Sequence, residues 1–122
     1  MAGLLMLLFV SGMARGEEPK KDVQALLGYC NAAIKTDSYT FCMGVVPGVA
    51  ETLEFVGQTR PRLRDQEDIK VITQMAMCGH PETTYGAMAQ AFVNWATAHP
   101  QFWDKPMTDG LALALIQTWP CY

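Results

Sequence analysis

The stretch that decides the fold is residues 39–56, which read YTFCMGVVPGVAETLEFV. Its apolar residues recur at spacings of three and four, which is typical of one face of an α-helix. Gly44, Pro47 and Gly48 interrupt the pattern, and each glycine costs a helix about 1 kcal/mol relative to alanine, a proline about 3 kcal/mol. We therefore expect either a helix in which the glycines let another helix approach closely, or a break into two helices at Pro47. The apolar stripe comprises Cys42, Val45, Val46, Val49, Leu53 and Val56.

Apolar residues at helical spacing predict four further helices around this stretch. Asp37 or Ser38 is available to cap the helix over 39–56, and Thr83 or Thr84 to cap a later one. No segment shows the alternation that is typical of a strand. The sequence therefore predicts an all-α fold, with four main helices in a compact bundle plus one short helix. The further helices are expected over residues 22–34, 68–77 (the short one), 85–99 and 106–119.

The N-terminal residues have the layout of a secretory signal peptide. An unbroken apolar run, Leu4–Val10, is followed by small and polar residues that end in Ala14-Arg15-Gly16. The run is far shorter than the roughly 20 residues that a membrane-spanning helix needs. We expect residues 1–16 to be a signal peptide and residues 17–122 to be one helical domain, located in the periplasm. A short N-terminal core helix is the alternative interpretation.

Four cysteines in a short exported chain indicate a disulfide framework. Cys30 ends the first expected helix and Cys42 lies near the start of the second. Cys78 precedes the third long helix and Cys121 follows the last. Antiparallel pairing of these helices favours the bridges Cys30–Cys42 and Cys78–Cys121 among the three possible connectivities. A zinc site is the alternative, but no pair of cysteines has C-x-x-C spacing.

The one basic cluster lies in a polar segment, Gln58–Glu67, which we expect to form the longest loop after Gly57 ends the preceding helix. Its members are Arg60, Arg62 and Arg64. The simple interpretation is a solvated loop, and the alternative is a docking site for acidic groups on a partner. The formal net charge of the whole chain is −3, and nothing in its distribution indicates binding to nucleic acid or to an anionic membrane.

The chain carries few residues for catalysis. Ser38 is expected to cap a helix, and His80 and His99 both precede prolines at the ends of elements. Glu51 and Glu54 are spaced as a pair of carboxylates on one helix, which suits a solvated face equally well. There is no phosphate-binding glycine loop, metal-ligand cluster or nucleotide motif. The sequence favours a protein that is not an enzyme, with no cofactor and no metal.

An ordered set of motifs around the four cysteines resembles the Rap/Tai family of type VI secretion immunity proteins. The resemblance covers about residues 25 to 121. Two residues depart from the family pattern. Val45 stands where the family usually has an aromatic residue, and Pro47 is unexpected in a helix. The motifs are Leu26-Leu27-Gly28-Tyr29-Cys30, the glycine-containing helix over residues 42–50, Cys78 followed by Pro81, Gln90 in a helix that ends at His99-Pro100, and the closing Trp119-Pro120-Cys121.

The resemblance implies a periplasmic protein that protects its producer from a cell-wall amidase delivered by sister cells. Such proteins bind a papain-like cysteine peptidase and occlude its active-site cleft, often as homodimers. Arg60, Arg62 and Arg64, in the expected loop, are the candidate contacts with this amidase. A second hypothesis is a general periplasmic chaperone or envelope stress protein with no cognate toxin.

Overall fold

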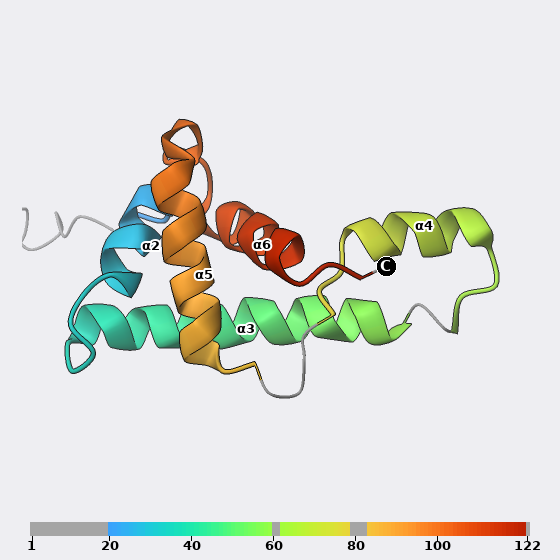
Figure 1. Ribbon diagram of the computed structural model, residues 1–122, viewed down its shortest axis with the longest axis horizontal. Coiled ribbons are helices and arrows are strands. Elements are labelled where there is room, and N and C mark those ends of the chain that lie inside the picture. Colours follow the sequence, from blue (N-terminus) through green and yellow to red (C-terminus); the bar gives the residue numbers. More distant parts are fainter. Residues whose placement is uncertain (1–19, 60–61, 79–82, 122) are drawn as a thin grey trace, which may run out of the picture.

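The computed structural model describes residues 20–59, 62–78 and 83–121, and the expected signal peptide lies outside these ranges. Within them the fold is all-α, and β-structure is limited to two isolated bridges. Four helices, α2, α3, α5 and α6, form a bundle and the further helix α4 lies beside it, which confirms the predicted class (Figure 1). The elements are α2 (Val23–Cys30), α3 (Asp37–Thr59), α4 (Gln66–Gln74), α5 (Tyr85–Ala98), the 3-10 helix η2 (Pro100–Phe102) and α6 (Met107–Thr118).

Helices α2, α3, α5 and α6 all contact one another and enclose the core. In Figure 1, α3 runs along one side of the bundle, α5 crosses it, and α2 and α6 lie on either side of α5. Phe92, Leu26, Leu111 and Leu115 are completely buried between them. Burying a side chain of this size stabilises a fold by about 1.5–3 kcal/mol, so these few residues carry much of the stability.

Helix α3 passes through Pro47 without a break. Cys42, Val46 and Ala50 are fully buried at four-residue spacing on either side of the proline, and this burial offsets the lost backbone hydrogen bond. The expected close approach at the glycines of this helix is wrong. Both Gly44 and Gly48 face open space, with no atom within 4 Å of a Cβ placed there.

The start of α3 and the end of α2 differ from the prediction. Neither Asp37 nor Ser38 caps α3, because both lie inside it; the Thr36 hydroxyl accepts a hydrogen bond from the Tyr39 amide at 3.3 Å instead. Helix α2 was expected to reach Ile34 but ends at Cys30. The chain must turn in this interval to bring Cys30 to its disulfide partner at the start of α3, and Ile34 is left 75% exposed.

Close approach between elements occurs at two other glycines. A Cβ on Gly110 of α6 would collide with the Cγ2 atom of Val23, which is itself fully buried. A Cβ on Gly57 of α3 would lie 3.0 Å from the Met77 carbonyl oxygen and 3.4 Å from the Cys121 sulfur. Gly57 was expected to end its helix, but the helix continues to Thr59, and Gly57 is a packing position within it.

Two disulfides join the pairs of cysteines that the helix order favours. Cys30–Cys42 connects α2 to α3, with 5.1 Å between the Cα atoms. Cys78–Cys121 connects the segment after α4 to the segment after α6, with 5.0 Å between the Cα atoms. The first bridge closes a loop with a sequence separation of 12 and the second a loop of 43.

We predict that Gly110→Ala lowers the free energy of unfolding by about 1–3 kcal/mol, because Val23 has no space into which it can move. Gly44→Ala is the matched control, since it adds the same methyl group to a helix in open space. It should stabilise the protein by about 0.5–1 kcal/mol. Urea unfolding followed by circular dichroism measures both changes. Equal effects of the two substitutions would contradict the contact at Gly110.

We also predict that the two disulfides differ in their contribution to stability. The chain-entropy estimate is about 4 kcal/mol for Cys78–Cys121 and about 3 kcal/mol for Cys30–Cys42. The double variant Cys78→Ala/Cys121→Ala should therefore unfold at a lower urea concentration than Cys30→Ala/Cys42→Ala. The reverse order would show that strain or residual structure outweighs the loop length.

Candidate functional site

The C-terminal part of α3 and helix α4 form a two-helix projection from the bundle, which we call the α3–α4 arm (residues 53–59 and 62–77). Figure 1 shows α4 lying beside the end of α3, away from α5. The Asp65 side chain caps α4 by accepting a hydrogen bond from the Glu67 amide at 2.9 Å. No residue of α4 is buried, so burial of its own side chains contributes little to holding it in place.

The arm is anchored where the chain leaves α4. The Met77 amide donates to the Leu53 carbonyl of α3 at 3.3 Å, and the Cys78 amide donates to the Trp119 carbonyl after α6 at 3.0 Å. The Cys78–Cys121 disulfide closes the same junction. The exit of α4 is therefore fixed to both α3 and the C-terminal segment.

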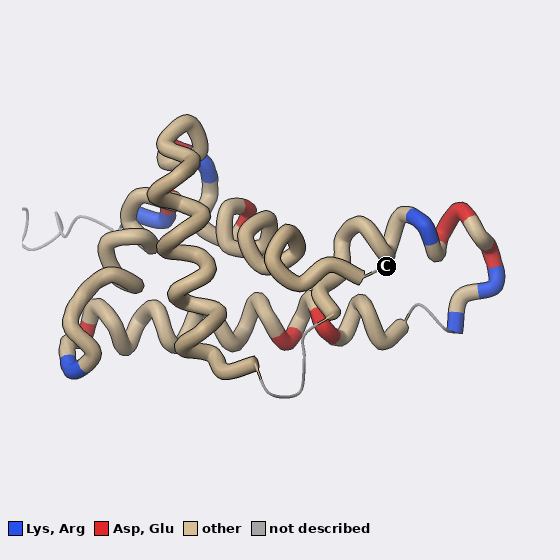
Figure 2. The backbone as a smooth tube through the Cα atoms, in the orientation of Figure 1, with Lys and Arg blue, Asp and Glu red and all other residues tan. Residues whose placement is uncertain are grey.

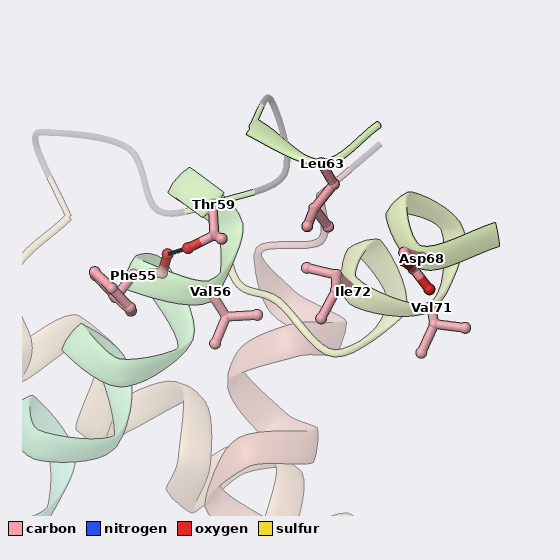
Figure 3. A pocket seen from close by; sticks show the side chains of 7 residues that line it. All are labelled: Phe55, Val56, Thr59, Leu63, Asp68, Val71 and Ile72. Carbon is pink, nitrogen blue, oxygen red and sulfur yellow. Dashed lines mark hydrogen bonds between the residues drawn. The ribbon is translucent and has the colours of Figure 1, made fainter. Parts of the chain in front are cut away.

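A groove of about 440 Å³ lies between the two helices of the arm. Figure 3 shows Phe55 and Val56 on the α3 side, Val71 and Ile72 on the α4 side, and Leu63 above them from the connecting chain. The lining is almost entirely apolar. Its two polar members are Thr59 and Asp68. The Thr59 hydroxyl already donates a hydrogen bond to the Phe55 carbonyl at 2.9 Å. Asp68 is the charged residue of this lining.

The arm exposes large apolar side chains that a solvated helix pair normally covers. Phe55 is 69% exposed, Met75 57% and Val71 52%. Met75 was expected to share a covered face with Ile69 and Ile72, which are only half-buried. Clustered apolar exposure of this kind marks interaction surfaces more often than scattered single residues do.

The arginine cluster lies at the outer end of the arm. Arg62 and Arg64 are exposed on either side of the half-buried Leu63, and Arg60 lies outside the described residues.

The connecting segment is shorter than the predicted loop over Gln58–Glu67, because α3 continues to Thr59 and α4 begins at Gln66. The cap at Asp65 was the sequence signal that this prediction overlooked. The groove residues were missed because nothing in the sequence indicated that these two helices face each other.

Residues that were considered for catalysis have structural roles where the structure describes them. The His99 ring stacks on Trp95 at 4.6 Å between ring centroids, and its Nδ1 atom lies 2.7 Å from the Trp95 carbonyl oxygen. A carbonyl only accepts, so Nδ1 carries the proton in this bond. Ser38 lies in the first turn of α3, and His80 is outside the described residues.

Glu51 accepts a hydrogen bond from the Tyr85 hydroxyl at 2.6 Å and thereby joins α3 to the start of α5. This bond is the main cause of a raised pKa at Tyr85, to which burial and the charges of Glu51 and Glu54 add. Tyr85 was expected in the core but is 40% exposed. Of the carboxylate pair on α3, Glu51 therefore serves a contact between helices.

In the part of the chain that the structure describes, no group of His, Cys, Asp and Glu is arranged to hold a metal ion. None of the described helices is long and apolar enough to cross a lipid bilayer. The described cysteines are all in disulfides, so none of them offers a nucleophilic thiol. Within the described ranges, the arm with its open apolar groove and flanking charges is the candidate binding surface.

A family model of Rap1a immunity proteins matches residues 22–121. The chain belongs to this family. The match begins at Asp22, the cap of α2, and ends at Cys121 of the second disulfide, so it covers the bundle and the arm together. Comparisons with curated proteins and with solved structures found no match.

We predict that Glu51→Ala lowers the pKa of Tyr85 toward its ordinary value of 10.0, because the acceptor and the nearest negative charge are removed. Because the folded-state pKa is raised, the contribution of this hydrogen bond to stability is present below pH 10.0 and lost as the pH rises through the raised pKa. Ultraviolet titration of tyrosinate, with Tyr85→Phe subtracted, isolates this residue. Coincident titration curves for the wild type and Glu51→Ala would contradict the interaction.

Proposed function

We propose that this protein is a periplasmic immunity protein that binds a type VI-delivered peptidoglycan amidase and protects the producing cell from it. The observation that carries the proposal is the Rap1a family match over residues 22–121. A protein of this kind acts as a stoichiometric inhibitor and not as an enzyme. The absence of a free thiol or metal cluster among the described residues is compatible with that role.

The cysteine chemistry supports a location outside the cytoplasm. Disulfides form and persist in oxidising compartments such as the periplasm, and this chain has two. The apolar run at Leu4–Val10 would direct the export, and the domain over residues 17–122 would remain after removal of residues 1–16. The amidase acts on the cell wall in the same compartment, so inhibitor and target would meet there.

We infer that the arm is the part that meets the amidase. A papain-like peptidase has its nucleophile in a cleft, and a projecting element can fill a cleft where a flat bundle face cannot. Arg62 and Arg64 lie exposed at the connection between α3 and α4, where Figure 2 shows charges of both signs gathered. With Arg60 they would bind acidic groups at the rim of the cleft and increase the association rate. A homodimer would present two such arms.

The test uses the purified mature protein and candidate type VI peptidoglycan amidases, beginning with any that a neighbouring gene encodes. We predict a complex with one inhibitor subunit per hydrolase subunit and loss of peptidoglycan amide hydrolysis at equimolar ratio. Arg60→Ala/Arg62→Ala/Arg64→Ala should slow association by about tenfold or more at low salt, with a smaller difference at high salt. Lys21→Ala/Lys35→Ala/Lys105→Ala removes three charges from the exposed surface elsewhere and is the matched control.

Full amidase activity in the presence of excess inhibitor would contradict the proposed function. Equal association rates for the two triple variants would contradict only the role of the arginines. Suppressed aggregation of unrelated unfolded clients, without any hydrolase complex, would favour the chaperone hypothesis instead. Mass spectrometry of the periplasmic protein tests the export step, because cleavage after Gly16 leaves Glu17 as the first residue.

A further inference from the structure

We infer that the groove between α3 and α4 binds an amphipathic segment of a partner protein that presents apolar side chains beside a lysine or arginine. This inference deepens the proposed function, since the amidase would supply that segment. The binding position is the groove itself and is distinct from the exposed arginines at its outer end. Its occupant is defined by three features of the described residues: an incomplete apolar layer, a single unpaired carboxylate and an elongated lining.

The apolar layer of the arm lacks a covering element. Helices bury their apolar stripes against a second layer, but α4 contributes no buried residue and Ile72 is only half-buried in the groove. Phe55 and Val71, from the two facing helices, are more than half exposed. An apolar segment laid between them would remove both side chains from water, which is the main favourable term in association.

Asp68 makes the groove favour a partner segment with a positively charged side chain. Its carboxylate lines the groove, and no hydrogen bond or ion pair reaches it within residues 20–59, 62–78 and 83–121. Thr59 satisfies its hydroxyl within α3 and so offers no donor to a ligand. A lysine or arginine at the edge of an apolar segment would pair with Asp68, whereas a carboxylate there would be repelled.

The shape of the lining favours a peptide segment over a compact ligand. Figure 3 shows Phe55 and Val71 on opposite sides, so an occupant must extend across the groove to contact both. A volume of about 440 Å³ accommodates more than one side chain. Binding of an amphipathic helix in an apolar groove is a common mode of protein recognition and uses side chains at helical spacing.

The experiment measures binding of two fluorescein-labelled amphipathic helical peptides by anisotropy. Both peptides carry leucines at helical spacing; one has lysines beside the leucines and the other has glutamates. We expect the wild type to prefer the lysine peptide, and Phe55→Ser or Val71→Ser to weaken its binding by about tenfold. Asp68→Lys should reverse the preference between the two peptides.

Ile34→Ser is the matched control, because Ile34 is 75% exposed in the connection between α2 and α3, before the start of α3 at Asp37. It should leave peptide binding unchanged. The thermal midpoint of each variant confirms that it is folded, and the exposure of Phe55 and Val71 makes retention of the fold the expected result. The same variants are then tested for their complex with the candidate amidase, where Phe55→Ser should also weaken binding.

Three results would overturn the inference. They are failure of the lysine peptide to bind the wild type, equal binding by Phe55→Ser and Ile34→Ser, and a dimer of the free protein that Phe55→Ser dissociates. The last result would identify a second copy as the occupant. If the peptide behaves as expected but the hydrolase does not bind the wild type, the groove stands and the proposed function fails. If the hydrolase binds the wild type and all groove variants equally, the proposed function stands and the groove is not the site that binds the amidase.

Discussion

The junction at Gly57 brings together three segments that lie far apart in the sequence. A Cβ on Gly57 of α3 would lie 3.0 Å from the Met77 carbonyl oxygen, which would have to shift, and 3.4 Å from the Cys121 sulfur, which is ordinary contact. The Cys78–Cys121 disulfide and the bond from the Cys78 amide to the Trp119 carbonyl close the same junction. The arm, the end of α6 and the second half of α3 all depend on it for their relative positions.

This arrangement separates a packed core from an apolar surface that is exposed to solvent. The bundle buries its large side chains between α2, α3, α5 and α6, whereas α4 has no buried residue. Because the junction fixes α4 at its exit, the helix can stay in place while its apolar side chains remain uncovered. A binding surface that is held in position before the partner arrives loses little conformational entropy on association.

Predictions that depend on residues close together in the sequence were more accurate than predictions that depend on tertiary contacts. Thr84 was named as a candidate cap, and its hydroxyl accepts from the Ala87 amide three residues on. Such bonds are local, so the sequence shows them directly. The start of α3 was harder to predict from the sequence, since Thr36, Asp37 and Ser38 are three consecutive residues that can each cap a helix. The favoured disulfide pairing is the pairing in the structure, because the order of the helices already limits which cysteines can meet.

The sequence alone indicated the all-α class, the five α-helices of the described residues and the favoured cysteine pairs, because helical spacing, caps and chain order are local or topological properties. Whether Pro47 breaks its helix, and which glycines allow close approach, was decided by tertiary packing. The reason is that a proline or glycine costs only a few kcal/mol, which burial of neighbouring side chains can offset or reverse. The groove between Phe55 and Val71 is likewise a tertiary feature, formed where α4 lies beside α3 and anchored by the Met77–Leu53 hydrogen bond and the Cys78–Cys121 disulfide.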